Sequence, residues 1–117
     1  MLRTILKSKI HKATVTEANV DYEGSITIDK DIMEAAALLE YEHVHVLSLS
    51  SGERLETYAI CGRPGSGQIC MNGAAAKVIA KGEKVIVLSF AQIGEDEART
   101  LVPKAIMLND KNEVVAV

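Results

Sequence analysis

The pair Gly24-Ser25 is the first place in this chain where residue type and spacing suggest chemistry. Glycine adopts backbone conformations that other residues resist, so a sharp corner can form here. In a tight turn, the hydroxyl of a serine that follows a glycine can reach the glycine carbonyl. The run Ile26-Thr27-Ile28 that comes next is typical of a strand. Taken alone, the pair predicts a corner leading into a strand, and an ordinary turn is the simpler interpretation.

Lys9 and His11 form a second candidate group. Residues 2–15 alternate loosely between apolar and polar types, and the β-branched residues near their end favour a strand. Lys9 and His11 then share a face, because strand side chains repeat every two residues. Two polar groups on one face suggest the rim of a pocket. A solvated strand face is the alternative.

His43 and His45 also share a face, since residues 43–50 alternate strictly. A two-histidine metal site is one interpretation. No third ligand of fitting type stands nearby in the sequence, so a solvated or hydrogen-bonded pair is favoured. Cys61 and Cys70 are too few and wrongly spaced for a metal site, and we expect free thiols. No metal centre is predicted.

Two glycine-rich stretches remain. Residues 62–67 resemble a phosphate-binding loop superficially but lack its Lys-Ser/Thr ending, so we reject that interpretation. In Asn72-Gly73-Ala74-Ala75-Ala76, small side chains would let backbone N–H groups approach a ligand closely. The alternative is a tight turn into a helix whose alanines simply pack.

The elements that position these residues are mostly short strands. Asp29 is a fitting N-cap for a helix over roughly residues 30–39, and helical turns are expected at 16–18 and 77–79. Residues 43–50 and 54–60 predict a hairpin, with Arg54, Glu56 and Tyr58 on one face of its second strand. Further strands are expected at 68–71, 84–91, 102–108 and 114–117, with 84–91 buried on both faces. This pattern predicts a single, mainly-β barrel domain.

The composition argues against a nucleic-acid-binding or membrane protein. The 117 residues are 48% hydrophobic and 25% charged, which is ordinary for a globular domain. A net charge of -3 and an aromatic content of 3% argue against a nucleic-acid surface. No apolar run reaches membrane-spanning length, and lysines interrupt the first residues where a signal peptide would be apolar. We therefore expect a cytoplasmic protein with no membrane or nucleic-acid partner.

Four motifs stand in one order along the chain. They are Lys9-Ile10-His11, Tyr22-Glu23-Gly24-Ser25, Arg54-x-x-Thr57-Tyr58-Ala59-Ile60 and Asn72-Gly73-Ala74-Ala75-Ala76. Together they resemble the pyruvoyl-dependent aspartate 1-decarboxylases of pantothenate biosynthesis, from residue 1 to about residue 108. Each motif alone is weak, but the four at matching spacing are highly specific.

The resemblance implies a double-psi β-barrel with small helical segments, assembled as a homotetramer with active sites at subunit boundaries. It also implies that the chain cleaves itself between Gly24 and Ser25, giving residues 1–24 and residues 25–117. In this reaction Ser25 Oγ attacks the Gly24 carbonyl, and elimination and hydrolysis leave a pyruvoyl group at residue 25. Peptide bonds resist such attack, so strain and hydrogen-bond donors should assist. Thr57 and Asn72 have this supporting role by resemblance.

The covalent pyruvoyl group is then the cofactor, and no metal is implied. It forms a Schiff base with L-aspartate, which loses CO₂ to give β-alanine. By resemblance Tyr58 donates the proton, and a phenol remains protonated near neutral pH. The resemblance implies that Lys9, Arg54, Thr57 and the backbone of residues 73–75 bind the substrate. The full set of implied site residues is Lys9, His11, Tyr22, Gly24, Ser25, Arg54, Thr57, Tyr58, Asn72, Gly73, Ala74 and Ala75. The alternative is a non-catalytic barrel module that binds an acidic ligand or a protein partner.

Overall fold

The computed structural model describes residues 1–117, which form nine strands and three short helices. The strands are β1 (Leu2–Thr14), β2 (Glu17–Asn19), β3 (Ser25–Asp29), β4 (His43–Ser48), β5 (Arg54–Gly62), β6 (Ile69–Asn72), β7 (Lys84–Gly94), β8 (Lys104–Leu108) and β9 (Val114–Ala116). The helices are α1 (Lys30–Ala35), α2 (Ala75–Val78) and α3 (Glu95–Thr100).

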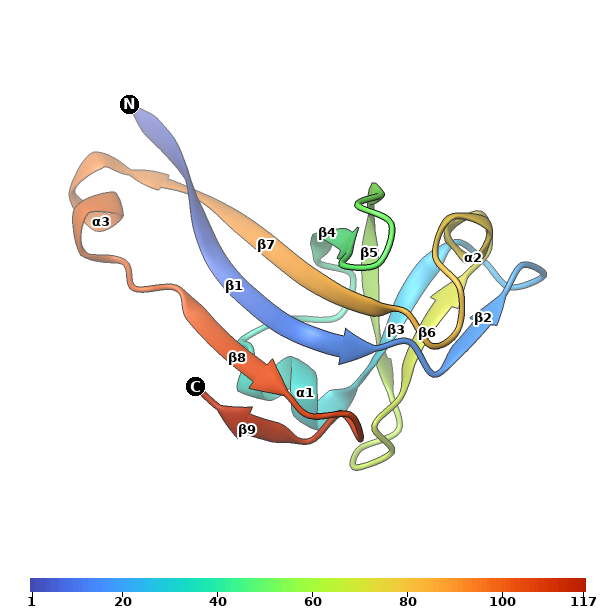
Figure 1. The fold of residues 1–117 in the computed structure, drawn as a ribbon. Coiled ribbons are helices and arrows are strands. Elements are labelled where there is room, and N and C mark those ends of the chain that lie inside the picture. Colours follow the sequence, from blue (N-terminus) through green and yellow to red (C-terminus); the bar gives the residue numbers. More distant parts are fainter.

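All nine strands belong to one mixed sheet with the order β2-β6-β3-β5-β4-β7-β1-β8-β9. Neighbours in this order are mostly far apart in the sequence, and β1 with β8, β2 with β6 and β3 with β5 pair in parallel. The sheet curves around one core. The helix α1 follows β3 and adds Ile32 and Met33 to the core, while α2 lies beside β6 and α3 lies at the end of β7 (Figure 1). The expected mainly-β barrel with small helical segments is confirmed, and the topology agrees with a double-psi barrel.

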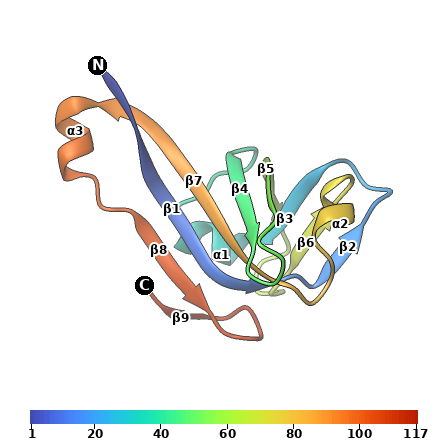
Figure 2. The same cartoon turned by 45° about the horizontal axis from the view of Figure 1, so that its top comes forward.

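A long ribbon of β1 and β7 extends from the barrel. The two strands pair antiparallel from Leu2 opposite Gly94 to Thr14 opposite Lys84. The N-terminus and α3 lie at the far end of the ribbon, away from β2 and β6 (Figure 2). At that end Arg3 forms a bidentate ion pair with Glu95, with both N–O distances 2.8 Å.

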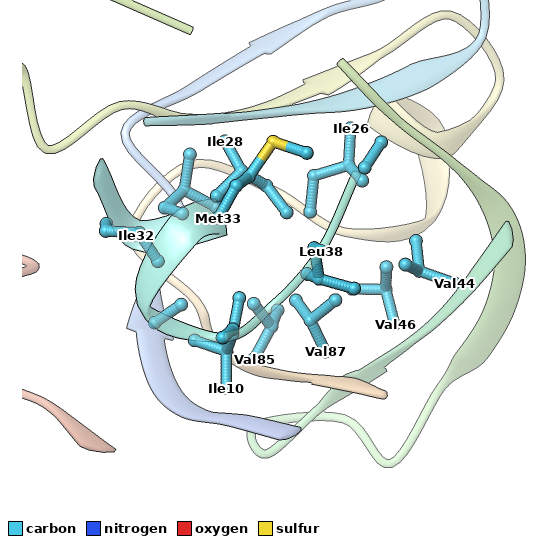
Figure 3. Packing of buried hydrophobic residues seen from close by; sticks show 14 of the residues in the cluster. Ile10, Ile26, Ile28, Ile32, Met33, Leu38, Val44, Val46, Val85 and Val87 are labelled. Carbon is cyan, nitrogen blue, oxygen red and sulfur yellow. The ribbon is translucent and has the colours of Figure 1, made fainter. Parts of the chain in front are cut away.

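The core is built from β-branched and other aliphatic side chains on the inner faces of the strands. Figure 3 shows the packing of Ile10, Ile26, Ile28, Ile32, Met33, Leu38, Val44, Val46, Val85 and Val87. Alternation explains this pattern, because every second residue of β4 and β7 points inward. β7 is therefore buried on one face only within this chain, and the expectation of burial on both faces is wrong.

Asp29 caps α1 as predicted. Its carboxylate accepts hydrogen bonds from the backbone N–H groups of Asp31, Gly65 and Gly67 at 2.8 to 3.1 Å. The cap therefore ties the 62–68 loop to the start of the helix. α1 ends at Ala35 rather than near 39, and Ala37 adopts a left-handed φ of 57°.

The segment 16–18 is also different from the prediction. Residues Glu17–Asn19 form β2, which pairs in parallel with β6, so the expected helical turn is wrong. The thiols of Cys61 and Cys70 are unpaired, as expected. None of the three helices has the length and apolar composition needed to cross a membrane.

Candidate active site

The Gly24-Ser25 corner is the start of β3, as the sequence predicts. Ser25 is 1% exposed and lies opposite Asn72 in the antiparallel pairing of β3 with β6. The Asn72 side-chain amide donates hydrogen bonds to Ser25 Oγ and Thr27 Oγ1, both at 2.9 Å. Ser25 Oγ in turn donates to the Glu23 carbonyl at 3.3 Å. The serine hydroxyl is thus buried and held between the Asn72 amide and the Glu23 carbonyl.

Cys70 completes this polar cluster, and sequence reasoning missed it. Its thiol lies 3.0 Å from Asn72 Oδ1 and can donate to it, while Asn72 Nδ2 faces Ser25. Burial, with a smaller contribution from the Glu17 charge, raises the pKa of the Cys70 thiol, which keeps the proton on sulfur. Cys70 therefore fixes the orientation of the Asn72 amide. The signal for it was available, because residues two apart on a strand share a face.

Gly73 brings the next segment directly onto the corner. Its φ is +66°, and a Cβ at this position would lie 2.7 Å from Gly24 Cα, 2.8 Å from Gly24 N and 2.9 Å from Tyr22 O. Any side chain there would therefore collide with the backbone of the corner. The left-handed glycine at the site is Gly73 and not Gly24.

A cavity of about 280 Å³ opens beside the corner. It brings together four of the predicted residues, Gly24, Thr57, Ala74 and Ala75, and its remaining walls are Leu55, Glu56 and Val78. The small side chains that follow Asn72 form the turn into α2, as the packing alternative predicts, and Ala74 and Ala75 also line this cavity. The approach of their backbone N–H groups to a ligand stays a prediction.

Strand pairing places Tyr58 on the same face as Ser25. Ile26 of β3 pairs with Ala59 of β5, and both are fully buried in the core. The residues before them, Ser25 and Tyr58, therefore lie on the opposite face of these adjoining strands. Tyr58 also packs near Tyr41, with ring centroids 6.4 Å apart.

Arg54 lies on the same face of β5 as Tyr58, two positions from Glu56, as predicted. It is exposed and its guanidinium makes no hydrogen bond or ion pair within the chain. An unpaired guanidinium of this kind is free to bind a carboxylate through two parallel hydrogen bonds. Tyr22 is 60% exposed in the turn that precedes the corner, and only its backbone approaches Gly73.

Lys9 and His11 line a separate cavity, also of about 280 Å³, between β1, β8 and β9. The expectation that they share a face at the rim of a pocket is confirmed. Burial, followed by the charges of Lys9 and Lys12, lowers the pKa of His11, so this imidazole is held neutral. The two cavities have no residue in common, and neither Arg54 nor Tyr58 lines either of them. One chain alone does not bring Lys9 and His11 to Ser25.

The two histidines of β4 do have a third partner. Glu56 of β5 lies directly opposite His45, and its carboxylate is 2.8 Å from His43 Nε2. The expectation that no third ligand stands nearby is therefore wrong, because strand pairing brings in a residue eleven positions further along the chain.

The chain is thus a mainly-β barrel in which an asparagine amide holds a buried serine beside a cavity. A family model described as aspartate decarboxylase matches residues 1–115, and the chain belongs to this family.

Curated relatives agree over nearly the whole chain. The aspartate 1-decarboxylase of Clostridium beijerinckii is 53% identical over 114 residues, which cover 97% of this chain and 92% of that protein. The aspartate 1-decarboxylase of Dehalococcoides mccartyi is 54% identical over 113 residues, covering 97% of this chain and 91% of the relative. That of Caldicellulosiruptor saccharolyticus is 52% identical over 115 residues, covering 98% and 90%.

Proposed function

We propose that this chain decarboxylates L-aspartate to β-alanine and CO₂, using a pyruvoyl group that it makes from its own Ser25. Membership of the aspartate decarboxylase family supports the reaction. The single observation that supports the source of the group is the buried hydrogen bond from Asn72 Nδ2 to Ser25 Oγ, at 2.9 Å, next to Gly24.

The self-processing steps use this chain's own atoms. Ser25 Oγ attacks the Gly24 carbonyl carbon, the amide bond breaks, and an ester forms while the hydroxyl proton passes to the freed amine. Elimination then removes the Cα proton of residue 25 and releases residues 1–24 as a carboxylate. Water replaces the nitrogen of the remaining dehydroalanine, and ammonia leaves. No external oxidant or reductant is required.

The neighbouring residues fit this role. Asn72 Nδ2 holds the hydroxyl oxygen in place, and the thiol of Cys70 keeps the amide turned that way. Thr57 lies across the same cavity as Gly24, where its hydroxyl can donate to charge that develops on the Gly24 oxygen. The close packing of Gly73 on Gly24 limits how far this backbone can move.

The residues around the corner also fit a pyruvoyl group at position 25. Once Ser25 Oγ has left with residues 1–24, the buried Asn72 Nδ2 lacks this acceptor, and a ketone oxygen on the adjacent Cα could replace it. When present, this group supplies a ketone that binds the substrate amine and accepts the electrons released as CO₂ leaves. Tyr58, on the same face, is the proposed proton donor. Its phenol O–H can give a proton to the carbon that loses the carboxylate.

Substrate binding requires cations, because aspartate carries two carboxylates. We assign one carboxylate contact to the unpaired guanidinium of Arg54 and another to the ammonium group of Lys9. Backbone N–H groups of Gly73, Ala74 and Ala75 complete the proposed substrate site. His11, held neutral beside Lys9, orders the second cavity.

A homo-oligomer, most simply a homotetramer, would bring these groups together. Lys9 lines one cavity of the chain and Gly24, the neighbour of Ser25, lines another, so we infer that a site using both Lys9 and Ser25 takes them from two copies. The face that carries Lys9 and Arg54 also carries apolar side chains, including Phe90 at 39% and Met107 at 37% exposure. Exposed apolar area of this kind is typical of an interface.

We further propose that the reaction takes place in the cytoplasm and supplies β-alanine for pantothenate synthesis. Two unpaired cysteines fit a reducing compartment.

Intact-mass analysis tests the proposed function. We expect two species that separate between Gly24 and Ser25, the larger without a free N-terminal amine, and release of β-alanine from L-aspartate. Ser25→Ala should abolish both cleavage and β-alanine production, because the hydroxyl that attacks is removed. The matched control, Ser50→Ala at an exposed turn, should process and turn over normally.

Two outcomes would overturn the proposal. β-Alanine production by Ser25→Ala would mean that the cofactor lies elsewhere. A single uncleaved chain with no β-alanine production would leave a non-catalytic barrel module as the better description.

A further inference from the structure

Three side chains with metal-binding atoms converge on the outer face of β4 and β5, the face that also carries Arg54 and Tyr58. His43 and His45 alternate on β4, and Glu56 lies directly opposite His45 on β5. His43 Nε2 and His45 Nε2 lie 2.8 Å and 3.5 Å from the same carboxylate oxygen of Glu56, Oε1. One ligand atom from each residue lies within 4.8 Å of the others.

The two imidazole rings are held in place by aromatic contacts. They stack on each other with centroids 5.3 Å apart and an interplanar angle of 25°. Phe90 of β7 packs its ring at 83° to His45, also at a centroid distance of 5.3 Å. Because neighbours fix the rings, little side-chain entropy is lost when both Nε2 atoms bind one ion.

We propose that His43, His45 and Glu56 form a binding site for a divalent transition metal ion, with Zn²⁺ as its favoured occupant. Zinc sites commonly combine two imidazoles with one carboxylate, at bond lengths of about 2.0–2.2 Å. Ligand atoms on a tetrahedral ion of that size lie roughly 3.3 Å apart, so the observed separations require only small side-chain adjustments. The imidazole nitrogens disfavour Mg²⁺ and Ca²⁺, which prefer oxygen ligands.

The fourth coordination position is left to water. A cavity of about 290 Å³ borders both histidines and is lined by Thr4, His43, His45, Phe90 and Gln92. Arg54 lies on the same face of β5 as Glu56, and its positive charge disfavours a bound cation there. Binding therefore depends on the donor strength of the two imidazoles more than on net charge.

The site would link β4 to β5 next to Tyr58, which lies opposite His43. None of its three ligands is assigned a role in processing or decarboxylation, although Glu56 also borders the cavity beside Gly24. Metal binding is therefore expected to be independent of the cleavage at Gly24-Ser25, and the uncleaved Ser25→Ala chain should bind the ion equally well.

Zn²⁺ binding to the full-length chain, measured by calorimetry after treatment with a chelator, tests the proposal. We expect one Zn²⁺ per chain, and visible absorption typical of a tetrahedral site when Co²⁺ is added instead. His45→Gln and Glu56→Gln should each weaken Zn²⁺ affinity by at least about tenfold, since each removes a direct ligand. Glu53→Gln, at an exposed position three residues away, should leave the affinity unchanged.

Thermal unfolding provides a second readout. Zn²⁺ should raise the Tm of the wild-type chain above its value in chelator, and should not raise the Tm of His45→Gln above its own value in chelator. Failure of the wild-type chain to bind Zn²⁺ stoichiometrically would overturn the proposal. So would loss of binding in His11→Gln alone, which would assign the ion to the cavity that Lys9 lines.

Discussion

At the scale of single residues, the proposed site depends on a buried hydroxyl, one amide that holds it and a glycine that cannot carry a side chain. Asn72 donates to both Ser25 and Thr27, so its amide is shared between the residue that would react and a neighbour on the same strand. Cys70 fixes the other end of that amide. Lys9 and Arg54, the cations proposed to bind substrate, lie outside this cluster of residues proposed for processing.

Gly73→Ala tests the packing on the corner. We expect the free energy of unfolding to fall by more than about 1 kcal/mol, because alanine disfavours positive φ and its Cβ meets backbone atoms that cannot move aside. Denaturant unfolding of the uncleaved Ser25→Ala background measures the change without interference from processing. The control is Gly94→Ala, where φ is negative and no atom lies within 4 Å. An equal decrease in the free energy of unfolding for Gly73→Ala and Gly94→Ala would show that the contact of Gly73 with Gly24 does not contribute to stability.

Arg54→Ala tests the separation of roles. Cleavage should remain complete, while kcat/KM for L-aspartate should fall by roughly a hundredfold or more, as expected when one partner of a desolvated ion pair is removed. Mass spectrometry follows cleavage, and release of β-alanine follows turnover. Arg63→Ala, in the loop after β5, is the control and should leave both unchanged. A failure of cleavage in Arg54→Ala would show that the guanidinium has a structural role.

At the scale of elements, local pattern predicted the strands well and their ends poorly. α1 was expected to reach residue 39, since Ala35–Leu39 favours a helix, but Leu38 is drawn into the core and the chain turns back at Ala37. The segment 16–18 is a strand because the edge of β6 is available to pair with it. In both cases a tertiary contact overrides a weak local propensity.

Glu42 connects three elements and gives a pH-dependent contribution to stability. Burial alone would raise its pKa, but hydrogen bonds from the Ser89 hydroxyl and the Leu39 backbone N–H, together with Lys7, outweigh burial and hold the pKa below its ordinary value. A carboxyl whose folded pKa is lowered stabilises the fold above its unfolded pKa, near 4.3, and this contribution is lost as pH falls through the folded pKa.

We therefore expect Glu42→Gln to lower the free energy of unfolding at pH 7 by about 1–2 kcal/mol. Its stability should also fall less than that of the wild type below about pH 4. Urea unfolding at a series of pH values measures both effects. Glu53→Gln, which loses no side-chain hydrogen bond, should follow the wild-type curve. A Glu42→Gln curve that runs parallel to the wild type at all pH values would contradict this assignment.

At the scale of the whole molecule, the separation of the two cavities makes a prediction about assembly. Lys9→Ala and Ser25→Ala chains should each be inactive when expressed alone. When the two are expressed together, mixed oligomers contain sites that take Ser25 from one variant and Lys9 from the other. Random mixing should restore roughly a quarter of wild-type activity if each site combines two copies.

The control for this experiment pairs Tyr58→Ala with Ser25→Ala, since these residues lie on adjoining strands of one chain. Co-expression of these two variants should restore no β-alanine production. If Lys9→Ala with Ser25→Ala also stays inactive although mixed oligomers form, both residues act within one chain.

The sequence by itself determined the alternation that builds the core, the corner at Gly24-Ser25, the cap at Asp29 and the motifs that identify the family. These are local signals, carried by residues within a few positions of one another. Only the tertiary structure decided which distant residues meet: Cys70 and Asn72 with Ser25, Glu56 with His43 and His45, and Lys9 apart from all of them. The physical reason is strand order and register, because a nine-stranded mixed sheet pairs segments far apart in the chain, and no single segment encodes its partner.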